Sequence, residues 1–159
     1  MATAFLRAGR YEEAAIGAER AMAFEPDIDR AHATLGWARF KKGRIAEGLA
    51  SLERAVALSP GNSQWLAQLG QAYALAGRID DAREILRQLE EQGKHSYVSP
   101  YHLVFVYTGL GEHERALDLL ERSVEEHAGA SYGIKGSFLL APLKSHPRFR
   151  ALLEKMRLA

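Results

Sequence analysis

The sequence predicts an all-α fold built from stacked antiparallel helix pairs, and three observations lead to this expectation. A glycine that opens a short charged stretch recurs at Gly9, Gly43, Gly77 and Gly111, 34 residues apart each time. Apolar residues recur at helical spacing in stretches such as RAHATLGWARFKKG and SQWLAQLGQAYALAG. Small residues occupy matching positions in successive units, where they allow two helices to approach closely. A fixed period without insertion indicates a stack in which each unit covers its neighbour.

Each unit is expected to contain two helices joined by the recurring glycine. A glycine just after the first helix suits a left-handed backbone conformation that strains other residues. Acidic pairs such as Asp80 and Asp81 then face the positive dipole end of the second helix. Pro60 stops a second helix, and Ser63 is the expected N-cap of the next first helix. The predicted units are a partial repeat at 1–28 and full repeats at 29–62, 63–96 and 97–130.

Both ends of the chain depart from the repeat. Only ATAFLRA remains of the first helix in the first unit, so we expect the parent protein to extend upstream of Met1. Gly129, Gly133 and Gly136 break the period at the other end. The segment 131–159 is expected to form a cap over the last repeat, with a short apolar stretch and then a helix at about 147–157.

The composition narrows the classes of function. The 21 basic and 20 acidic residues give a net charge of +1, which favours binding neither to nucleic acid nor to an anionic membrane. The chain has no cysteine, which excludes disulfides and thiolate metal sites and fits a cytoplasmic location. No apolar run is long enough to span a bilayer, and the first residues do not form a secretory signal.

No motif argues for catalysis, and we expect neither a metal nor a cofactor. The six histidines lack the spacing of a helical metal site. The stretch GLGEHE lacks the third glycine and the Lys-Ser/Thr of a phosphate loop and is interpreted as another helix connection. Any catalytic activity is expected in an upstream domain.

The 34-residue period and its pattern of small residues resemble the tetratricopeptide repeat family over residues 1–130. The resemblance implies a right-handed superhelix whose first helices line a concave groove that holds peptides or partner helices. Departures from the family pattern are His32 and Pro100 at aromatic positions, Arg39 in place of tyrosine and Gly48 in place of alanine.

The resemblance also assigns the groove residues. They are Arg30, Thr34, Trp37, Phe40, Lys41, Gln64, Gln68, Gln71, Leu75, Val98, Tyr101, His102 and Phe105. Their aromatic members are expected to form an exposed binding patch, or alternatively to pack in part against the first helix or the tail. Ala33 and Trp37 occupy positions where some family members carry a clamp for a C-terminal carboxylate, so that mode is not expected.

The function expected from these features is that of a non-catalytic protein–protein interaction module with a protein or peptide ligand. One alternative is self-assembly, as a homodimer, through an apolar edge around Phe5 and Leu6; another is a chaperone of a secretion system. The tail PLKSHPRFRALL resembles the ends of such repeat regions in bacterial multidomain signalling proteins, which carry cyclase, kinase or winged-helix domains. This second resemblance implies that the chain is an arm of a larger signalling or regulatory protein.

Overall fold

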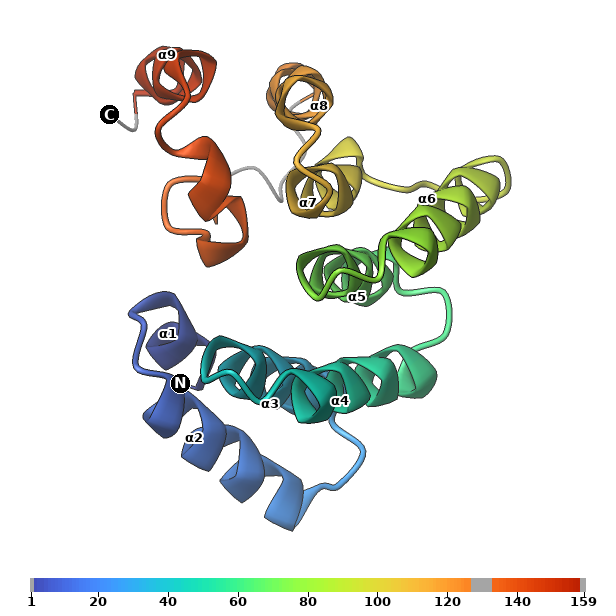
Figure 1. Cartoon of the computed structure of the whole chain (residues 1–159), viewed down its shortest axis with the longest axis vertical. Coiled ribbons are helices and arrows are strands. Elements are labelled where there is room, and N and C mark those ends of the chain that lie inside the picture. The colour runs from blue at the N-terminus through green and yellow to red at the C-terminus, as the bar shows by residue number, and fades with distance from the viewer. Residues whose placement is uncertain (1, 127–132, 158–159) are drawn as a thin grey trace.

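The computed structural model describes residues 2–126 and 133–157, and its helices form a curved stack of antiparallel pairs (Figure 1). The described residues contain no β-strand, so the all-α prediction is confirmed. The pairs are α1 (Ala2–Arg7) with α2 (Tyr11–Phe24), α3 (Asp29–Lys41) with α4 (Ile45–Leu58), α5 (Ser63–Leu75) with α6 (Ile79–Gly93), and α7 (Pro100–Gly109) with α8 (His113–Glu125). The 3₁₀ helix η2 (Phe138–Leu143) and the helix α9 (Pro147–Lys155) complete the described chain.

The recurring glycines connect the two helices of each pair. Gly9, Gly43, Gly77 and Gly111 have φ values of +73°, +83°, +82° and +75°. A Cβ atom on any of them would meet no atom within 4 Å. The backbone conformation, and not crowding, therefore explains why glycine recurs at this position.

A second use of glycine is the close approach of α3 and α4. A Cβ on Gly36 would lie 2.9 Å from the carbonyl oxygen of Gly48, and a Cβ on Gly48 would lie 2.8 Å from that of Gly36. The two backbones are in direct contact, which leaves no room for a side chain on either. This packing explains physically why Gly48 stands where alanine is expected.

The starts of the helices confirm one prediction from the sequence and correct another. Asp80 and Asp81 lie in the first turn of α6, as expected. The N-cap of α5, however, is Asn62 and not Ser63, because the Asn62 side chain accepts hydrogen bonds from the backbone amides of Gln64 and Trp65. Ser63 is the first residue of α5, and its hydroxyl turns instead toward α7.

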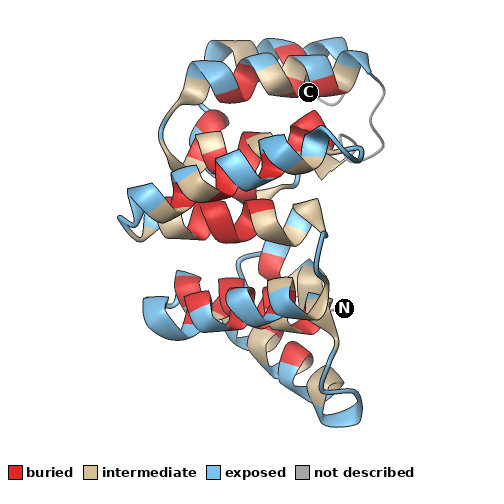
Figure 2. Cartoon of the chain, turned by 90° about the vertical axis from the view of Figure 1, so that its right-hand side faces the viewer, coloured by how far each residue is buried: buried red, intermediate tan, exposed pale blue. Residues whose placement is uncertain are grey.

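The C-terminal segments belong to the hydrophobic core. Ile134, Leu140, Leu143 and Phe149 are buried in the same cluster as the repeat helices. In Figure 2 the buried residues concentrate in the middle and upper part of the stack, whereas the first pair, at the lower end, carries few of them. This segment therefore packs as an integral part of the stack.

Ion pairs fix helix α9 to α8, and most of them come from one arginine. The guanidinium of Arg148 lies 2.6 Å from a carboxylate oxygen of Glu114, 2.7 Å from one of Asp118 and 2.9 Å from one of Glu121. The hydrogen bond from Arg148 holds the pKa of the Glu114 carboxyl below its ordinary value. The helix ends at Lys155, two residues before the expected end near 157. Gly129 and the expected boundary between 130 and 131 lie outside the described residues.

Candidate binding groove

The chain's own C-terminal segment lies on the concave face of the stack. Figure 1 shows η2 between α1 and α7, on the inner side of the curve. The side-chain amide of Gln71 donates a hydrogen bond of 2.7 Å to the carbonyl oxygen of Leu139. The ring of Phe138 packs edge-on against Trp37, with 5.4 Å between ring centroids. The segment therefore fills part of the groove that the repeats form.

This arrangement corrects the expected aromatic patch. Trp37, Phe40, Tyr101 and Phe105 are all buried, and Trp37 is only 1% exposed. The physical reason is that these rings pack against one another and against Phe138 rather than facing solvent. The alternative interpretation, in which groove aromatics contact the tail, describes the structure better than an exposed patch does.

An open cavity of about 800 Å³ remains beside the segment. Eight of the predicted groove residues line it: Arg30, Thr34, Trp37, Gln64, Gln68, Tyr101, His102 and Phe105. The other five do not line it: Phe40, Lys41, Gln71, Leu75 and Val98. Among these five, Lys41 and Gln71 contact the C-terminal segment, since the Lys41 ammonium lies 6.0 Å from the Phe138 ring centroid.

Two hydrogen bonds between neighbouring first helices fix the polar groups of the cavity wall. The indole of Trp37 on α3 donates to the amide oxygen of Gln68 on α5, over 2.8 Å. The Ser63 hydroxyl on α5 and Nδ1 of His102 on α7 lie 2.8 Å apart. Burial lowers the pKa of His102 to about 4, so this imidazole is neutral near pH 7.

The carboxylate of Asp29, which lines the cavity, already accepts hydrogen bonds from two neighbouring side chains. The Asp29 carboxylate accepts a hydrogen bond from the Ser59 hydroxyl and one of 2.8 Å from the Trp65 indole. These hydrogen bonds, that of Ser59 above all, hold the pKa of Asp29 below its ordinary value. Asp29 therefore positions Trp65. The guanidinium of Arg30 forms no ion pair with another of the described residues, but its charge helps to lower the pKa of Asp29.

Sequence reasoning missed several lining residues, namely Arg7, Asn62, Trp65, Ser137, Phe138 and Leu139. Arg7 is the last residue of α1, and the chain's curvature brings it opposite α7. The signal for Phe138 was present, because FLLAPL is an apolar stretch outside the repeat period. The 34-residue period, however, does not indicate where that stretch packs.

The described residues offer no other chemistry that stands out. They contain no cluster of three or more His, Cys, Asp or Glu side chains that could hold a metal ion. Among the helices of the described ranges, none has both the length and the apolar character needed to cross a membrane. The site consists of an aromatic floor and a rim of amide, imidazole and guanidinium groups.

The curved stack of paired helices and its concave cavity define the class as a helical-repeat scaffold, whose curvature creates an extended binding surface. Residues 39–100 match the family model described as tetratricopeptide repeat. Residues 39–100 therefore carry the tetratricopeptide repeat pattern, and the described helices have the fold of that family.

A solved structure gives the same result for the fold. The structure of MamA from AMB-1, in crystal form P212121, is 20% identical and aligns with a TM-score of 0.51 over 99% of this chain and 85% of that chain. At this level of identity the likeness concerns the fold alone. A comparison with curated proteins gave no match.

Proposed function

We propose that the chain is a non-catalytic protein–protein interaction module that binds a short peptide segment in the open part of its concave groove. One observation carries the proposal: a cavity of about 800 Å³ combines a buried aromatic floor with polar groups at its rim. That volume lies in the range of sites that take small ligands or a few residues of a peptide, about 300–1,000 Å³.

The rim supplies groups that suit a peptide. Arg30 and Gln64 are exposed, lie on neighbouring first helices and carry donor groups in the lining of the groove. A peptide main chain offers carbonyl oxygens to such donors, while an apolar side chain gains burial against Trp65 and Phe105. Gln71 already makes this kind of contact with a main-chain carbonyl of the C-terminal segment.

We further propose that the chain is an arm of a larger bacterial signalling or regulatory protein that acts in the cytoplasm. The support is the likeness of PLKSHPRFRALL to the ends of repeat regions in such proteins. In this chain the stretch includes the end of η2 and most of α9. The catalytic or DNA-binding function would then reside in another domain.

A matched pair of variants tests the groove. Gln64→Trp adds a ring at the mouth of the cavity, whereas Gln88→Trp adds the same ring at an exposed position of α6 away from it. Peptides selected from a displayed random library on the wild-type chain should lose at least about tenfold in affinity on Gln64→Trp. They should keep their affinity on Gln88→Trp. Fluorescence anisotropy gives the affinities, and circular dichroism checks that both variants stay folded.

The Gln88→Trp control shows whether a loss of peptide affinity is specific to the groove or a general effect of adding a tryptophan. Selected peptides that bind both variants as tightly as the wild type would remove the groove from the proposal. A selection that yields no peptide at all would remove peptide binding itself.

A further inference from the structure

Two basic side chains on the concave face have no acidic partner. Arg7 is the last residue of α1, and Lys41 is the last residue of α3. Both residues are exposed, and neither forms an ion pair with another residue in the ranges 2–126 and 133–157. Their charges are therefore available to a ligand of the groove.

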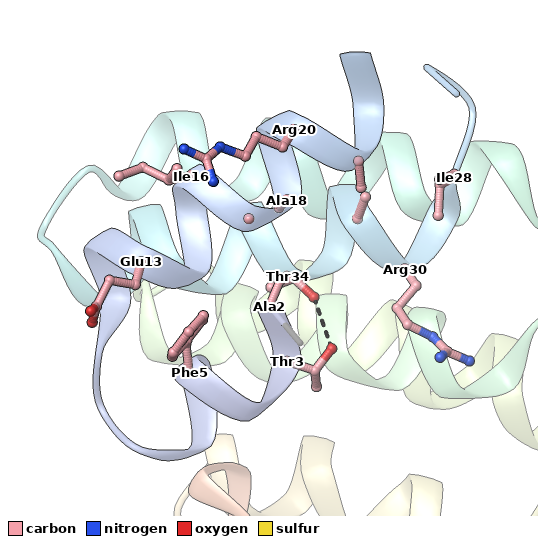
Figure 3. A pocket seen from close by; sticks show the side chains of 13 residues that line it. Ala2, Thr3, Phe5, Glu13, Ile16, Ala18, Arg20, Ile28, Arg30 and Thr34 are labelled. Atoms are coloured by element: carbon pink, nitrogen blue, oxygen red, sulfur yellow. Dashed lines mark hydrogen bonds between the residues drawn. The ribbon is translucent and has the colours of Figure 1, made fainter. Parts of the chain in front are cut away.

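The repeat places these two cations next to each other. Lys41 follows Arg7 by one period of 34 residues, so the two occupy the same position on two successive first helices. Helices α1 and α3 are in contact, and the hydroxyl oxygens of Thr3 and Thr34 lie 3.4 Å apart between them (Figure 3). The axes of helices packed in this way are about 8–10 Å apart. The equivalents of these cations in the later pairs are uncharged, namely Leu75 and Gly109.

Both cations lie beside the C-terminal segment and the cavity. A Cβ added to Gly133 would be 4.0 Å from an Nη atom of Arg7, and the Lys41 ammonium lies 6.0 Å from the ring centroid of Phe138. Arg7 and Phe138 line the cavity together. Burial raises the pKa of Tyr101 in the cavity wall, and the nearby charge of Arg7 partly opposes this rise. The field of Arg7 therefore reaches the floor of the groove.

The other charges of the cavity compensate one another. Besides Arg7, the charged residues of the described lining are Asp29 and Arg30. The charge of Arg30 acts on Asp29 and helps to lower its pKa, so these two opposite charges offset each other. His102 is neutral near pH 7 because burial lowers its pKa to about 4. The groove is therefore electropositive, although the net charge of the whole chain is only +1, and this favours a negatively charged ligand.

We propose that the peptide bound in the groove is acidic, with Asp or Glu side chains that pair with Arg7 and Lys41 beside an apolar residue on the aromatic floor. This inference rests on the proposed peptide site and names the chemistry of its ligand. Carboxylates form charge-assisted hydrogen bonds with guanidinium and ammonium groups. Two side chains that are two residues apart lie on one face of an extended peptide, about 7 Å from each other. Long basic side chains on neighbouring helices can reach both.

The expected contact differs from a clamp for a C-terminal carboxylate. Positions of that clamp correspond to Ala33 and Trp37 in this chain, and neither can form an ion pair. Arg7 and Lys41 lie at another position of the repeat, nearer the end of the first helix. The proposed ligand therefore uses side-chain carboxylates and needs no free chain end.

The first test is the composition of the bound peptides. Peptides selected on the wild-type chain from a displayed random library should contain Asp and Glu more often than the unselected library does. One such peptide is then compared with a version in which Gln replaces each acidic residue, and both termini are blocked in each. The Gln version should bind about tenfold more weakly, and the difference should shrink as the salt concentration rises. Fluorescence anisotropy measures both affinities.

Matched variants of the chain locate the charges. Arg7→Gln and Lys41→Gln should each weaken binding of the acidic peptide about threefold, and the double variant should bind both peptides equally. Arg87→Gln and Lys94→Gln remove the same charges from exposed positions outside the cavity lining, so they should leave the affinity unchanged. Circular dichroism checks that all variants are folded.

A purely structural role of the two cations predicts a different result. A basic residue in the last turn of a helix also interacts with the negative end of the helix dipole. In that case Arg7→Gln and Lys41→Gln would lower the stability measured by urea denaturation but keep the wild-type preference for the acidic peptide, which would overturn the proposal. Equal binding of the two peptides by the wild type would overturn it as well. A short oligothymidylate that displaces the acidic peptide at lower concentration than the unlabelled peptide does would assign the cations to nucleic acid instead.

The peptide site and its preference for acidic residues can fail separately. Selected peptides that lose affinity on Gln64→Trp but carry no excess of Asp or Glu would keep the peptide site and remove only the present inference. A selection that yields no peptide would remove the proposed function and this inference with it.

Discussion

The two ends of the helix stack differ in how far their apolar helix surfaces are covered. At the C-terminal end, Ile134, Leu140 and Leu143 are fully buried, and Arg148 fixes α9 to α8. At the N-terminal end, α1 covers part of α2 and leaves Ile16 41% exposed. A repeat stack always ends in an incomplete interface. The C-terminal segment of this chain covers one end, whereas the first pair leaves part of α2 exposed.

The largest expected difference between the two ends is in the cost of removing an aliphatic side chain. Leu140→Ala leaves a cavity in the closed end and should lower the free energy of unfolding by about 3 kcal/mol. Ile16→Ala at the open end should lower it by only about 1 kcal/mol, because that side chain is already partly hydrated in the folded state. Urea denaturation followed by circular dichroism measures both. Similar losses in the two variants would contradict the assignment of a closed and an open end.

The second expected effect is a pH dependence that originates in the closed half. Burial lowers the pKa of His102 to about 4, so between pH 6.5 and 4 the unfolded chain binds a proton there that the folded chain does not. The contribution of His102 to the free energy of unfolding is therefore fully present above about pH 6.5 and is lost as the pH drops through this window. Allowing for partial exposure, the loss from this residue is about 2 kcal/mol.

Two glutamine variants isolate that contribution. His102→Gln keeps a group able to bond Ser63 but does not titrate, so the loss between pH 7 and pH 4.5 should be smaller than in the wild type. His95→Gln, at an exposed position of α6's C-terminal loop, should behave like the wild type. Hydrogen exchange should place the difference in α5 and α7 and leave α1 and α2 unchanged. A His102→Gln variant as pH-sensitive as the wild type would show that the folded protein accepts a proton on His102.

The fold was predictable because its determinants are local and periodic. The glycines at Gly43 and Gly77 demand a left-handed backbone whatever surrounds them, and their spacing alone gives the helix pairs. The N-cap of α5 was placed one residue late, because both Asn62 and Ser63 can cap a helix and only geometry selects between them.

The site was less predictable because its determinants are not local. The repeat pattern places Trp37 and Tyr101 on the inner face, and they do line the cavity. It contains no information about a segment such as Phe138–Leu143 that lies outside the period and returns to that face. The pairing of Trp37 with Phe138 joins residues from the second pair and the tail, a contact that no spacing in the sequence encodes.

The smallest expected effect is that of adding volume at Ala21, and it is measured against the same change at the equivalent position of a filled interface. Ala55→Leu forces a larger side chain into a filled space and should cost about 2 kcal/mol. Ala21→Leu, one period earlier, places the same atoms in the open space between α1, α2 and α3, where burial of added apolar surface should stabilise the fold by about 0.5 kcal/mol. The two variants differ only in whether a helix already covers the position. Changes of opposite sign in the free energy of unfolding, measured by urea denaturation, would therefore show that the space beside Ala21 is unfilled. A loss at Ala21 equal to that at Ala55 would mean that no free space lies beside Ala21 in solution.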